Sequence, residues 1–553
     1  MQTRHTVTID GHEVGYTVTT GVIVLKEETE KKGDKEGEFE GEKPRASVFF
    51  VAYTREGVED PASRPITFCF NGGPGSSSVW LHLGAFGPRR VQLTDDGDLP
   101  PPPFRLVNNE HSLLDLTDLV FIDPVSTGYS RPVEGEKAKA FHGFKKDIES
   151  VGDFIRLYTT RAGRWGSPKF LIGESYGTTR AAGLSGYLQE RHGLYLNGIM
   201  LISSVLDFGT LLFQPGNDLP YILFLPTYTA TAHYHGRLPA ELQGRPLANL
   251  LGEVRAFALG DYASALLQGH ALPAEEEEQM ARRLAAYMGV SVDFVQRHNL
   301  RVPIYRFTKE LLRDQGLTTG RLDSRFTGAD RDRGGERFEY DPSYAVIQGP
   351  YTATFNDYVR RELKFESDMA YEILTGRVRP WNYETFQNAY VYVAETLRKA
   401  MNINPFLKVF VANGYYDLAT PFLATEYTFN HLMLPPARRA FLDLIRDADK
   451  LDIFRVVAEG LERNGFRELA DMWPHIQLDG PVNPLLLGDI RARNKGDVAH
   501  VESLADFLLL EASWLCELHF APARARARRA RVLDTLAAHL PADPDVRAVL
   551  DNI

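Results

Sequence analysis

The stretch "KFLIGESYGTTRAAGLSGYLQE" (residues 169–190) is an apolar segment followed by a sharp turn and a segment of helical character. Its turn, "GESYG" (173–177), fits the pattern G-x-S-x-G. In that pattern the serine lies on a strained strand-to-helix turn, with its hydroxyl exposed above a sheet. The pattern is short and occurs by chance, so the surrounding sequence has to support it. With a strand before it and a helix after it, Ser175 is predicted to be a nucleophile.

Other apolar strands alternate with helices around this turn. Such alternation implies a mostly parallel sheet that is covered on both faces. Together with the serine turn, it predicts an α/β fold of the α/β-hydrolase type. The segments are "ASVFFVAYTR" (46–55), "ITFCFNGG" (66–73), "DLVFIDPVSTGYS" (118–130), "GFKKDIESVGDFIRLYTTR" (143–161) and "LNGIMLISSVLDF" (196–208).

The amino-terminal residues predict a hairpin and then a loop. "HTVTIDGHEVGYTVTTGVIVL" (5–25) alternates apolar and polar residues around Asp10-Gly11, a dipeptide typical of tight hairpin turns. The following "KEETEKKGDKEGEFEGEKPR" (26–45) is a run of mixed charge with three glycines. We expect this run to be a solvated loop.

The middle of the chain has a different pattern, which predicts an insertion of helices. "LPAEEEEQMARRLAAYMG" (272–289) opens with proline and four glutamates and ends at glycine, as helices do. We therefore expect a hydrolase core in two parts, residues 1–214 and 381–437. A mainly helical cap (215–380) separates the two parts, and a helical tail (438–553) follows them.

Composition excludes some classes of function. The chain has 553 residues and a net charge of −11, which argues against a general nucleic-acid partner. No run of about 18 apolar residues indicates a membrane span. The two cysteines, Cys69 and Cys516, lie too far apart to indicate a disulfide framework. The first residues lack the apolar core of a signal peptide, so a cytoplasmic location is the default, with a periplasmic or secreted one left open.

A serine nucleophile needs a base to take its proton and N–H donors to bind the oxyanion. One donor is expected to be the backbone of Tyr176, the residue after the nucleophile. The glycine-rich "FNGGPGSSSVW" (70–80), which follows a predicted strand, is a good source of the other. Hydrolases of this fold place the acid later in the chain and the histidine after it. Asp417, just past the late apolar strand in "FLKVFVANGYYDLATPF" (406–422), is in the right place to be that acid.

These motifs resemble those of a known family. "NGGPGSSS", "GESYG" and the late "NGYYD" stand in the order and spacing of the serine carboxypeptidases, and the resemblance extends over residues 1–437. It implies that Ser175 is the nucleophile and Asp417 the acid. It also implies that the N–H groups of Gly73 and Tyr176 form the oxyanion hole. Peptides would be the substrates, and no cofactor would be needed.

The same resemblance implies that Asn71, Gly72 and Glu174 hold the free carboxylate at the peptide's C-terminus. Two carboxylates share a dry cleft only when a proton lies between them. Glu174 therefore predicts a preference for acid pH on peptides. The family's tryptophan before the asparagine is absent, because "FCF" precedes Asn71 here. We expect this difference to alter the binding of the substrate's C-terminal carboxylate.

The family's histidine, carried by a Gly-His pair after the acid, is missing. The histidines that follow Asp417 are His431, His475, His500, His519 and His539, and none of them follows glycine. His475 has tolerable spacing but the wrong surroundings, so it is a weak candidate. A structural or partly exposed role is favoured for these histidines. The expected carboxypeptidase activity is therefore impaired.

After "TEYTFNHLMLPPARRA" (425–440) the hydrolase resemblance ends. The tail, residues 441–553, resembles the C-terminal half of an HD-domain phosphohydrolase, and Asp449 matches that family's late metal-binding aspartate. The upstream histidine and His-Asp pair have no counterpart. A single carboxylate does not make a metal site, so no metal is predicted.

Three other functions are considered. An esterase or lipase of the same fold would share the serine turn, and a non-catalytic peptide-binding remnant would explain the missing Gly-His. The third, a metal-dependent phosphohydrolase activity in the tail, is the least favoured. The sequence does not give the substrate side-chain preference or the oligomeric state.

Overall fold

The structure is a computed structural model that describes residues 1–31, 37–94, 96–434, 477–493, 500–515 and 531–550, with residues 457, 461, 496 and 527–528. These residues divide into two compact units. The first comprises residues 1–239 and 251–433, and the second comprises residues 240–250 and 434–553.

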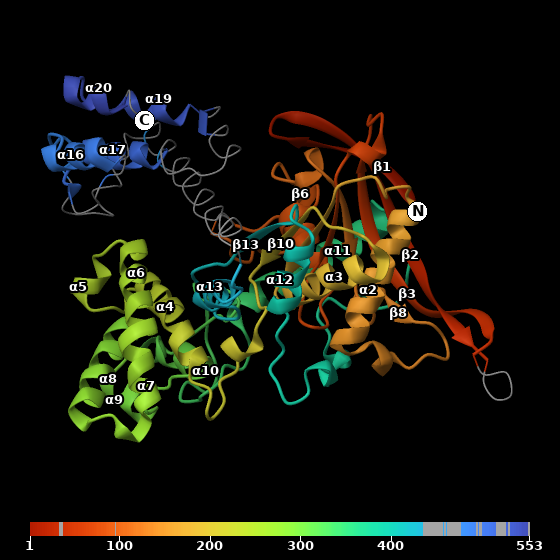
Figure 1. The fold of residues 1–553 in the computed structure, drawn as a ribbon, viewed down its shortest axis with the longest axis horizontal. Helices are drawn as coiled ribbons and strands as arrows, with labels where there is room; N and C mark the ends of the chain where they lie inside the picture. Colours follow the sequence, from red (N-terminus) through yellow and green to blue (C-terminus); the bar gives the residue numbers. More distant parts are fainter. Residues whose placement is uncertain are drawn as a thin grey trace. The chain divides into compact units, whose positions relative to one another are not determined.

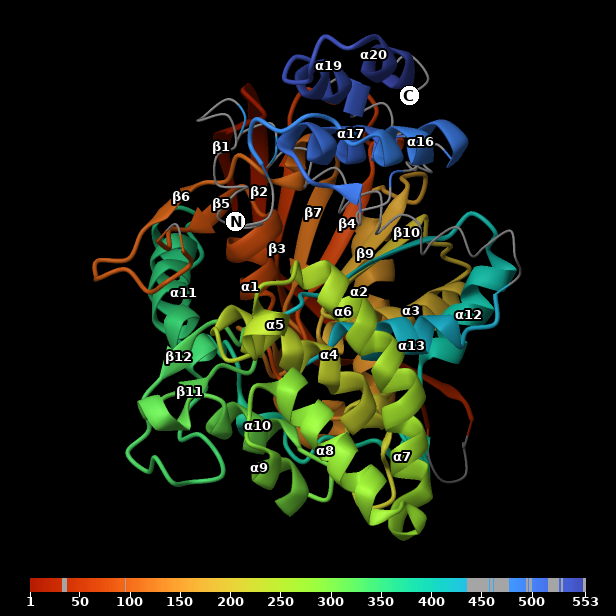
Figure 2. The ribbon, with the colours of Figure 1, turned by 90° about the vertical axis from the view of Figure 1, so that its left-hand side faces the viewer.

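In the described residues, the first unit is built on a nine-stranded sheet with the order β1-β2-β3-β7-β4-β9-β10-β13, and β8 pairs with β3 at its side. Strands β7, β4, β9, β10 and β13 run parallel, and β1, β2 and β3 are antiparallel. Figure 2 shows the middle strands of this sheet side by side. The fold is therefore α/β, with the strand arrangement of an α/β-hydrolase, as predicted. The strands are β1 (Gln2–Ile9), β2 (His12–Glu30), β3 (Phe39–Arg55), β4 (Ile66–Phe70), β7 (Asp118–Ile122), β8 (Arg131–Pro132), β9 (Lys169–Glu174), β10 (Gly198–Ile202) and β13 (Lys408–Ala412).

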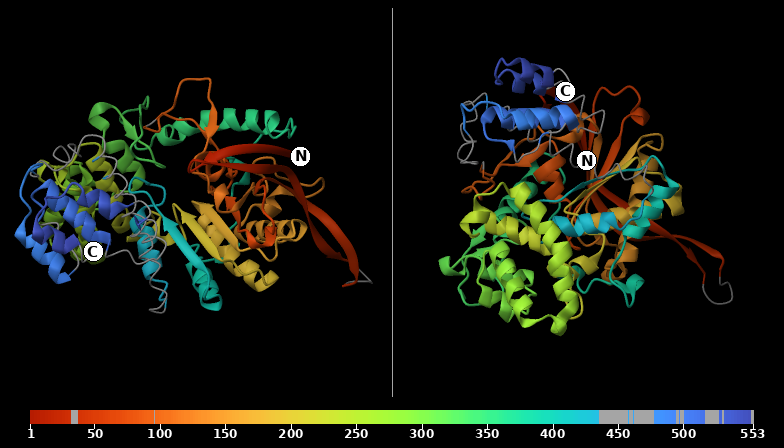
Figure 3. Two further views of the ribbon diagram at one scale, coloured as in Figure 1. Left: turned by 90° about the horizontal axis from the view of Figure 1, so that it is seen from above. Right: turned by 60° about the vertical axis from the view of Figure 1, so that its left-hand side comes forward.

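Helices cover both faces of the sheet. Successive strand residues point to opposite sides, so neighbouring residues of one strand pack against different helices. Phe50 of β3 packs against Phe154 and Tyr158 of helix α2. Its neighbour Phe49 and the nearby Tyr53 belong to a core cluster that includes helix α11. Figure 3 shows α11 and α2 on opposite sides of the strands. The helices of the core are α1 (Val79–Leu81), α2 (Phe144–Arg161), α3 (Tyr176–His192), α11 (Pro342–Arg361), α12 (Ala394–Ile403) and α13 (Phe422–Asn430).

The predicted amino-terminal hairpin is confirmed, but the loop expected at residues 26–45 is wrong in large part. Both turn residues, Asp10 and Gly11, have positive φ, as a type I′ turn requires. Strands β2 and β3 then continue through most of the charge run, to Glu30 and from Phe39. Lys26 of β2 pairs with Glu42 of β3, and Lys31 pairs with Glu38 just beyond the ends of the two strands. Such opposite-charge pairs stabilise paired strands that are exposed to solvent. Composition alone does not reveal which charges will pair across the strands.

Residues 215–380 are mainly helical, and the helix predicted at 272–289 is confirmed as α8, which ends at Gly289 in the left-handed conformation. Figure 1 shows α7, α8 and α9 gathered together. The helices of this region are α4 (Leu219–Tyr234), α5 (Ala240–Gln243), α6 (Leu247–Phe257), α7 (Ala263–Gln268), α8 (Ala274–Met288), α9 (Val292–Arg297) and α10 (Ile304–Glu310). Two small two-stranded sheets pair β5 (Arg89–Val91) with β6 (Leu106–Asn108), and β11 (Thr318–Thr319) with β12 (Thr327–Gly328).

The described part of the tail is helical and has its own apolar cluster, centred on helix α17. Its helices are α16 (Pro484–Arg493), α17 (Leu504–Trp514), α19 (Val532–Ala537) and α20 (Pro544–Leu550). Ser503 and Asp506 form a capping box at the start of α17. Asp449 lies outside the described residues, and the resemblance of the tail to an HD domain stays a prediction.

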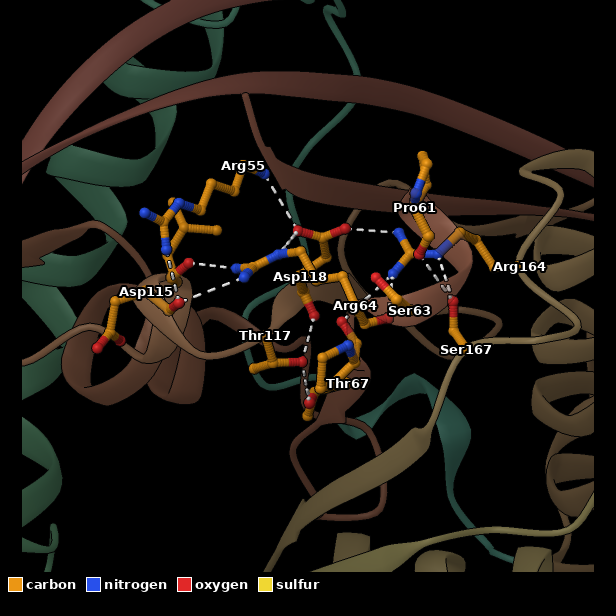
Figure 4. Close-up of polar contacts among 12 residues, drawn as sticks. Arg55, Pro61, Ser63, Arg64, Thr67, Asp115, Thr117, Asp118, Arg164 and Ser167 are labelled. Carbon is orange, nitrogen blue, oxygen red and sulfur yellow. Dashed lines mark hydrogen bonds and ion pairs between the residues drawn. The ribbon is translucent and has the colours of Figure 1, made fainter. Parts of the chain in front are cut away.

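A buried ion cluster fixes the amino-terminal ends of the central strands (Figure 4). Asp118, at the start of β7, accepts hydrogen bonds from Arg64 Nε (2.8 Å) and Arg164 Nη1 (2.5 Å). It also accepts one from the backbone N–H of Arg55 (3.1 Å). Asp118 is 2% exposed and Arg164 4%. One carboxylate therefore balances two guanidinium groups at this end of the sheet.

We predict that Asp118→Asn lowers the free energy of unfolding by about 3–5 kcal/mol, because it leaves buried guanidinium charge without a counterion. Asp293→Asn is the control, since Asp293 forms an exposed pair with Arg297 within one helix. Its loss should cost about 0.5 kcal/mol or less. Urea denaturation followed by tryptophan fluorescence measures both. Equal losses in the two variants would contradict the structural role of Asp118.

Candidate active site

Ser175 lies at the turn between strand β9 and helix α3, as the sequence predicts. Its backbone has φ 57° and ψ −127°, a conformation that residues with a side chain rarely adopt. Such strain costs on the order of 1–3 kcal/mol and is retained where the surroundings enforce it. Here its N–H donates to the carbonyl of Ile202 at the end of β10 (2.9 Å), and its carbonyl accepts from the N–H of Thr178 (2.8 Å). The side chain of Ser175 is half-buried.

The glycines of the turn are required by close backbone contacts. A Cβ atom on Gly173 would lie 2.1 Å from the carbonyl oxygen of Gly177. A Cβ atom on Gly177 would lie 2.7 Å from the carbonyl oxygen of Phe70, at the end of β4. Distances this short exclude a side chain at either position. The serine turn therefore packs directly against the neighbouring strand end.

The glycine-rich loop after β4 lies against the serine turn. A Cβ atom on Gly72 would be 2.3 Å from the backbone nitrogen of Tyr176. Gly73 follows with φ 103°, which glycine adopts without strain. The backbone of the Gly72-Gly73 turn and the N–H of Tyr176 are therefore neighbours beside Ser175. The predicted oxyanion hole, formed by the N–H groups of Gly73 and Tyr176, requires that these two backbone segments lie together.

Asn71 and Glu174 also meet at this point. The side-chain amide of Asn71 donates to Oε2 of Glu174 (2.8 Å), and its Oδ1 accepts from the N–H of Leu81 (3.1 Å). Burial raises the pKa of Glu174 to about 7, and the charge of Asp417 also raises it. Hydrogen bonds from Asn71 and the N–H of Gly72 act in the opposite direction. Glu174 therefore binds a proton close to neutral pH.

A buried ion pair that we did not predict holds this loop in place. Arg180 of α3 donates to Asp147 of α2 (2.8 Å) and to the backbone carbonyl of Asn71 (2.6 Å). Both charged side chains are buried, Arg180 at 1% and Asp147 at 3% exposure. The guanidinium also lies over the rings of Phe70 and Tyr176. Because Asn71 and Arg180 are 109 residues apart, no local pattern could reveal this contact.

Asp417 follows strand β13 and is held by a set of donors. Its Oδ1 accepts from the N–H groups of Ala419 (2.8 Å) and Thr420 (3.0 Å), and its Oδ2 from the hydroxyl of Thr420 (2.7 Å). Ser203, at the end of β10, also donates to it. Burial raises its pKa above the usual range, and these hydrogen bonds oppose the shift. Asp417 and Glu174 are close enough for their charges to interact.

In the described part of the chain, no histidine is hydrogen-bonded to Ser175 or Asp417. His431 contacts the carbonyl of Tyr427 (2.7 Å), and His500 contacts Asp489 (2.6 Å). His475 and His519 lie outside the described residues. Within the described residues, therefore, no histidine is in place to take the proton of Ser175.

Two further findings concern ligands and membranes. Among the described residues, no group of three or more histidine, cysteine or acidic side chains could hold a metal ion. Every helix within these residues is too short or too polar to cross a bilayer.

Comparison with known proteins identifies the part of the chain that contains this site. A family model described as serine carboxypeptidase matches residues 37–209. This segment, less than half of the chain, is therefore similar to the serine carboxypeptidases. The matched range contains the glycine-rich loop and the serine turn, whereas Asp417 lies beyond it. The hydrolase class that the motifs predicted is thereby confirmed for this segment.

The relatives match only part of the chain. Serine carboxypeptidase-like 46 of Arabidopsis thaliana is 28% identical over 183 residues, which are 31% of this chain and 35% of that protein. The pheromone-processing carboxypeptidase KEX1 of Saccharomyces cerevisiae is 34% identical over 116 residues, 20% of this chain and 15% of that protein. The chain thus spans about a third or less of these curated relatives.

A crystal structure of KEX1(delta)p, a prohormone-processing carboxypeptidase from Saccharomyces cerevisiae, is 17% identical with a TM-score of 0.43. The likeness covers 75% of this chain and 77% of that one. None of these findings supports the cytoplasmic location predicted by default, and the periplasmic and secreted alternatives remain open.

We predict that Gly72→Ala destabilises the protein by about 1–3 kcal/mol, because the added methyl group collides with the backbone of Tyr176. Gly21→Ala, in strand β2, is the matched control, since a Cβ atom there meets no atom within 4 Å. Thermal unfolding followed by circular dichroism compares the two. If both variants unfold at the parent's temperature, the loop does not pack on the serine turn as described.

Proposed function

We propose that this protein is a serine-type hydrolase that releases the C-terminal residue of a peptide through an acyl-enzyme on Ser175. The observation that carries this proposal is the contact between the Gly72-Gly73 turn and the N–H of Tyr176, beside a serine in a strained turn. The similarity of residues 37–209 to the serine carboxypeptidases supports the same reaction class.

In the proposed reaction, Oγ of Ser175 attacks the scissile carbonyl carbon, and its proton passes to a base. The N–H groups of Gly73 and Tyr176 stabilise the negative charge on the carbonyl oxygen. The C–N bond then breaks, and the C-terminal amino acid leaves with a proton on its nitrogen. Water attacks the resulting ester and regenerates the serine hydroxyl. No step needs a cofactor.

Recognition of the C-terminus is assigned to Asn71, Gly72 and Glu174. When Glu174 is protonated, its hydroxyl can donate to a substrate carboxylate, and the Asn71 amide and the Gly72 N–H add further donors. When Glu174 is ionised, the two carboxylates repel each other. The pKa of Glu174, raised to about 7, makes the protonated form available below neutrality.

We predict that binding of a peptide with a free C-terminus weakens as the pH rises through about 7. The sign follows from the pKa, because Glu174 loses its proton in this range and then opposes the carboxylate. Calorimetric titration of the Ser175→Ala variant measures the dissociation constant between pH 5 and 8. The amidated peptide and the Glu174→Gln variant should both lack the pH dependence. A pH profile that Glu174→Gln leaves unchanged would refute the assignment.

A second candidate function is peptide binding without catalysis. The observation in its favour is that no described histidine contacts Ser175 or the proposed acid, Asp417. Asp417 can orient a histidine and stabilise its charge, but it does not replace the base. The two candidates therefore share the same site and differ in whether Ser175 is activated.

We predict that the chain is a poor peptidase and that its tail is the reason. Loss of the triad in a serine hydrolase costs on the order of 10⁶ in turnover, while the oxyanion hole and binding retain about 10³–10⁴ over water. A chimera tests this, with residues 441–553 replaced by a serine carboxypeptidase C-terminus that carries Gly-His. Both proteins are assayed on a blocked dipeptide. If the parent equals the chimera in turnover, a histidine of the tail is the base, and His475→Ala should then abolish activity.

A further inference from the structure

A cavity of about 580 Å³ lies beside the proposed acid. This volume is typical of a small-ligand site. Its walls come from the segment after β10, from helices α4 and α10, from the segment around Arg337, and from the acid loop itself. The lining includes Phe213, Tyr221, Phe224, Arg321, Arg337 and Leu418.

One side of the cavity is aromatic. The ring of Phe213 contacts those of Tyr221 (5.0 Å between centroids) and Phe224 (4.9 Å). Such a cluster forms a firm apolar surface on which the methylene groups of a long side chain can pack. An apolar wall alone would accept many side chains, so the charged groups of the lining decide the selectivity.

The charged side of the cavity is cationic, in a chain whose net charge is −11. Three arginines and one glutamate line it, and Glu336 pairs with Arg306. Arg337 lies over the ring of Tyr305. Within the described residues, neither Arg321 nor Arg337 has a carboxylate partner for its guanidinium group. Arg321 is partly buried and Arg337 is exposed at the rim, so both guanidinium groups are available to a ligand carboxylate.

Arg321 is joined to the acid loop through its backbone. Its carbonyl accepts the N–H of Leu418 (3.0 Å), the residue after Asp417. Ala419, another residue of the cavity wall, donates its N–H to Asp417 (2.8 Å). The position of the cationic wall is therefore fixed relative to the proposed acid, as a substrate pocket requires.

We infer that this cavity binds the side chain of a glutamate in the peptide substrate, and the inference rests on the proposed function. The methylene groups pack on the aromatic wall, and the carboxylate pairs with the guanidinium groups of Arg321 and Arg337. Arginine suits this role because its planar group can bind both oxygens of a carboxylate. Arg306 and Glu336 of the same lining already form an arginine–carboxylate pair of this kind.

The test uses the full-length Ser175→Ala variant, so that binding is measured without turnover. N-acetyl tripeptides carry glutamate at each of the three positions in turn, with alanine elsewhere, and each has a glutamine counterpart. Every peptide is made with a free and an amidated C-terminus. Calorimetric titration gives the dissociation constants. At one position glutamate should bind about tenfold more tightly than glutamine, a difference that higher salt reduces.

Substitutions in the cavity then test whether its arginines cause the preference for glutamate. Arg321→Gln should bring the glutamate-to-glutamine ratio close to one, Arg321→Lys should preserve part of it, and Arg337→Gln should reduce it. Arg331→Gln is the matched control, because Arg331 is exposed, as Arg337 is, but does not line the cavity. Thermal unfolding identifies any variant that fails to fold, and Arg337→Gln then serves in place of Arg321→Gln.

Three outcomes would overturn the inference. The first is the absence of a glutamate preference at every position, and the second is its survival in both arginine-to-glutamine variants. The third is that these variants abolish the preference for a free over an amidated C-terminus but leave the glutamate preference intact, which would mean that the cavity holds the terminal carboxylate. Failure of the proposed function is a separate result, since it appears as the lack of Ser175-dependent hydrolysis in the chimera that carries Gly-His.

Discussion

The close approach of Gly72 to the backbone nitrogen of Tyr176 is the constraint on which the candidate site depends. It arises from the sheet, because β4 and β9 are parallel neighbours and Phe70 pairs with Gly173 in their register. The loop that leaves β4 and the turn that leaves β9 therefore emerge side by side at the same sheet edge. Only residues without a Cβ atom allow the two backbones to come this close, so the glycines follow from the strand register.

A buried ion pair then holds together the loop and the turn that the strand register places side by side. Arg180 connects the helix after Ser175 to the loop before Gly72, by donating to the carbonyl of Asn71. Asp147 balances the charge of Arg180, and both are removed from water. Removing one partner of such a pair is costly, because the other stays buried and unpaired. The glycine-rich loop after β4 is therefore held by helices α2 and α3 as well as by its own sequence.

These features differ in how far the sequence predicts them. The hairpin at Asp10-Gly11, the turn at Ser175 and the helix ending at Gly289 were predicted because a few adjacent residues determine each of them. The strands within residues 26–45 were missed because their stability comes from pairs across the hairpin, such as Lys26 with Glu42. Arg180 and Ser203, which donates to Asp417, were missed for the same reason. Their partners are distant in sequence, and a single sequence does not record such contacts.

The surroundings of Asp417 bear on the missing base. A carboxylate has about four lone-pair sites, and Asp417 receives four hydrogen bonds. Two come from backbone N–H groups, and two from the hydroxyls of Thr420 and Ser203. The backbone donors belong to the turn itself, so an imidazole reaching Asp417 would have to replace a hydroxyl. Within the described residues, the donors to Asp417 are groups other than histidine, and an imidazole that reached it would compete with the hydroxyl of Thr420 or Ser203.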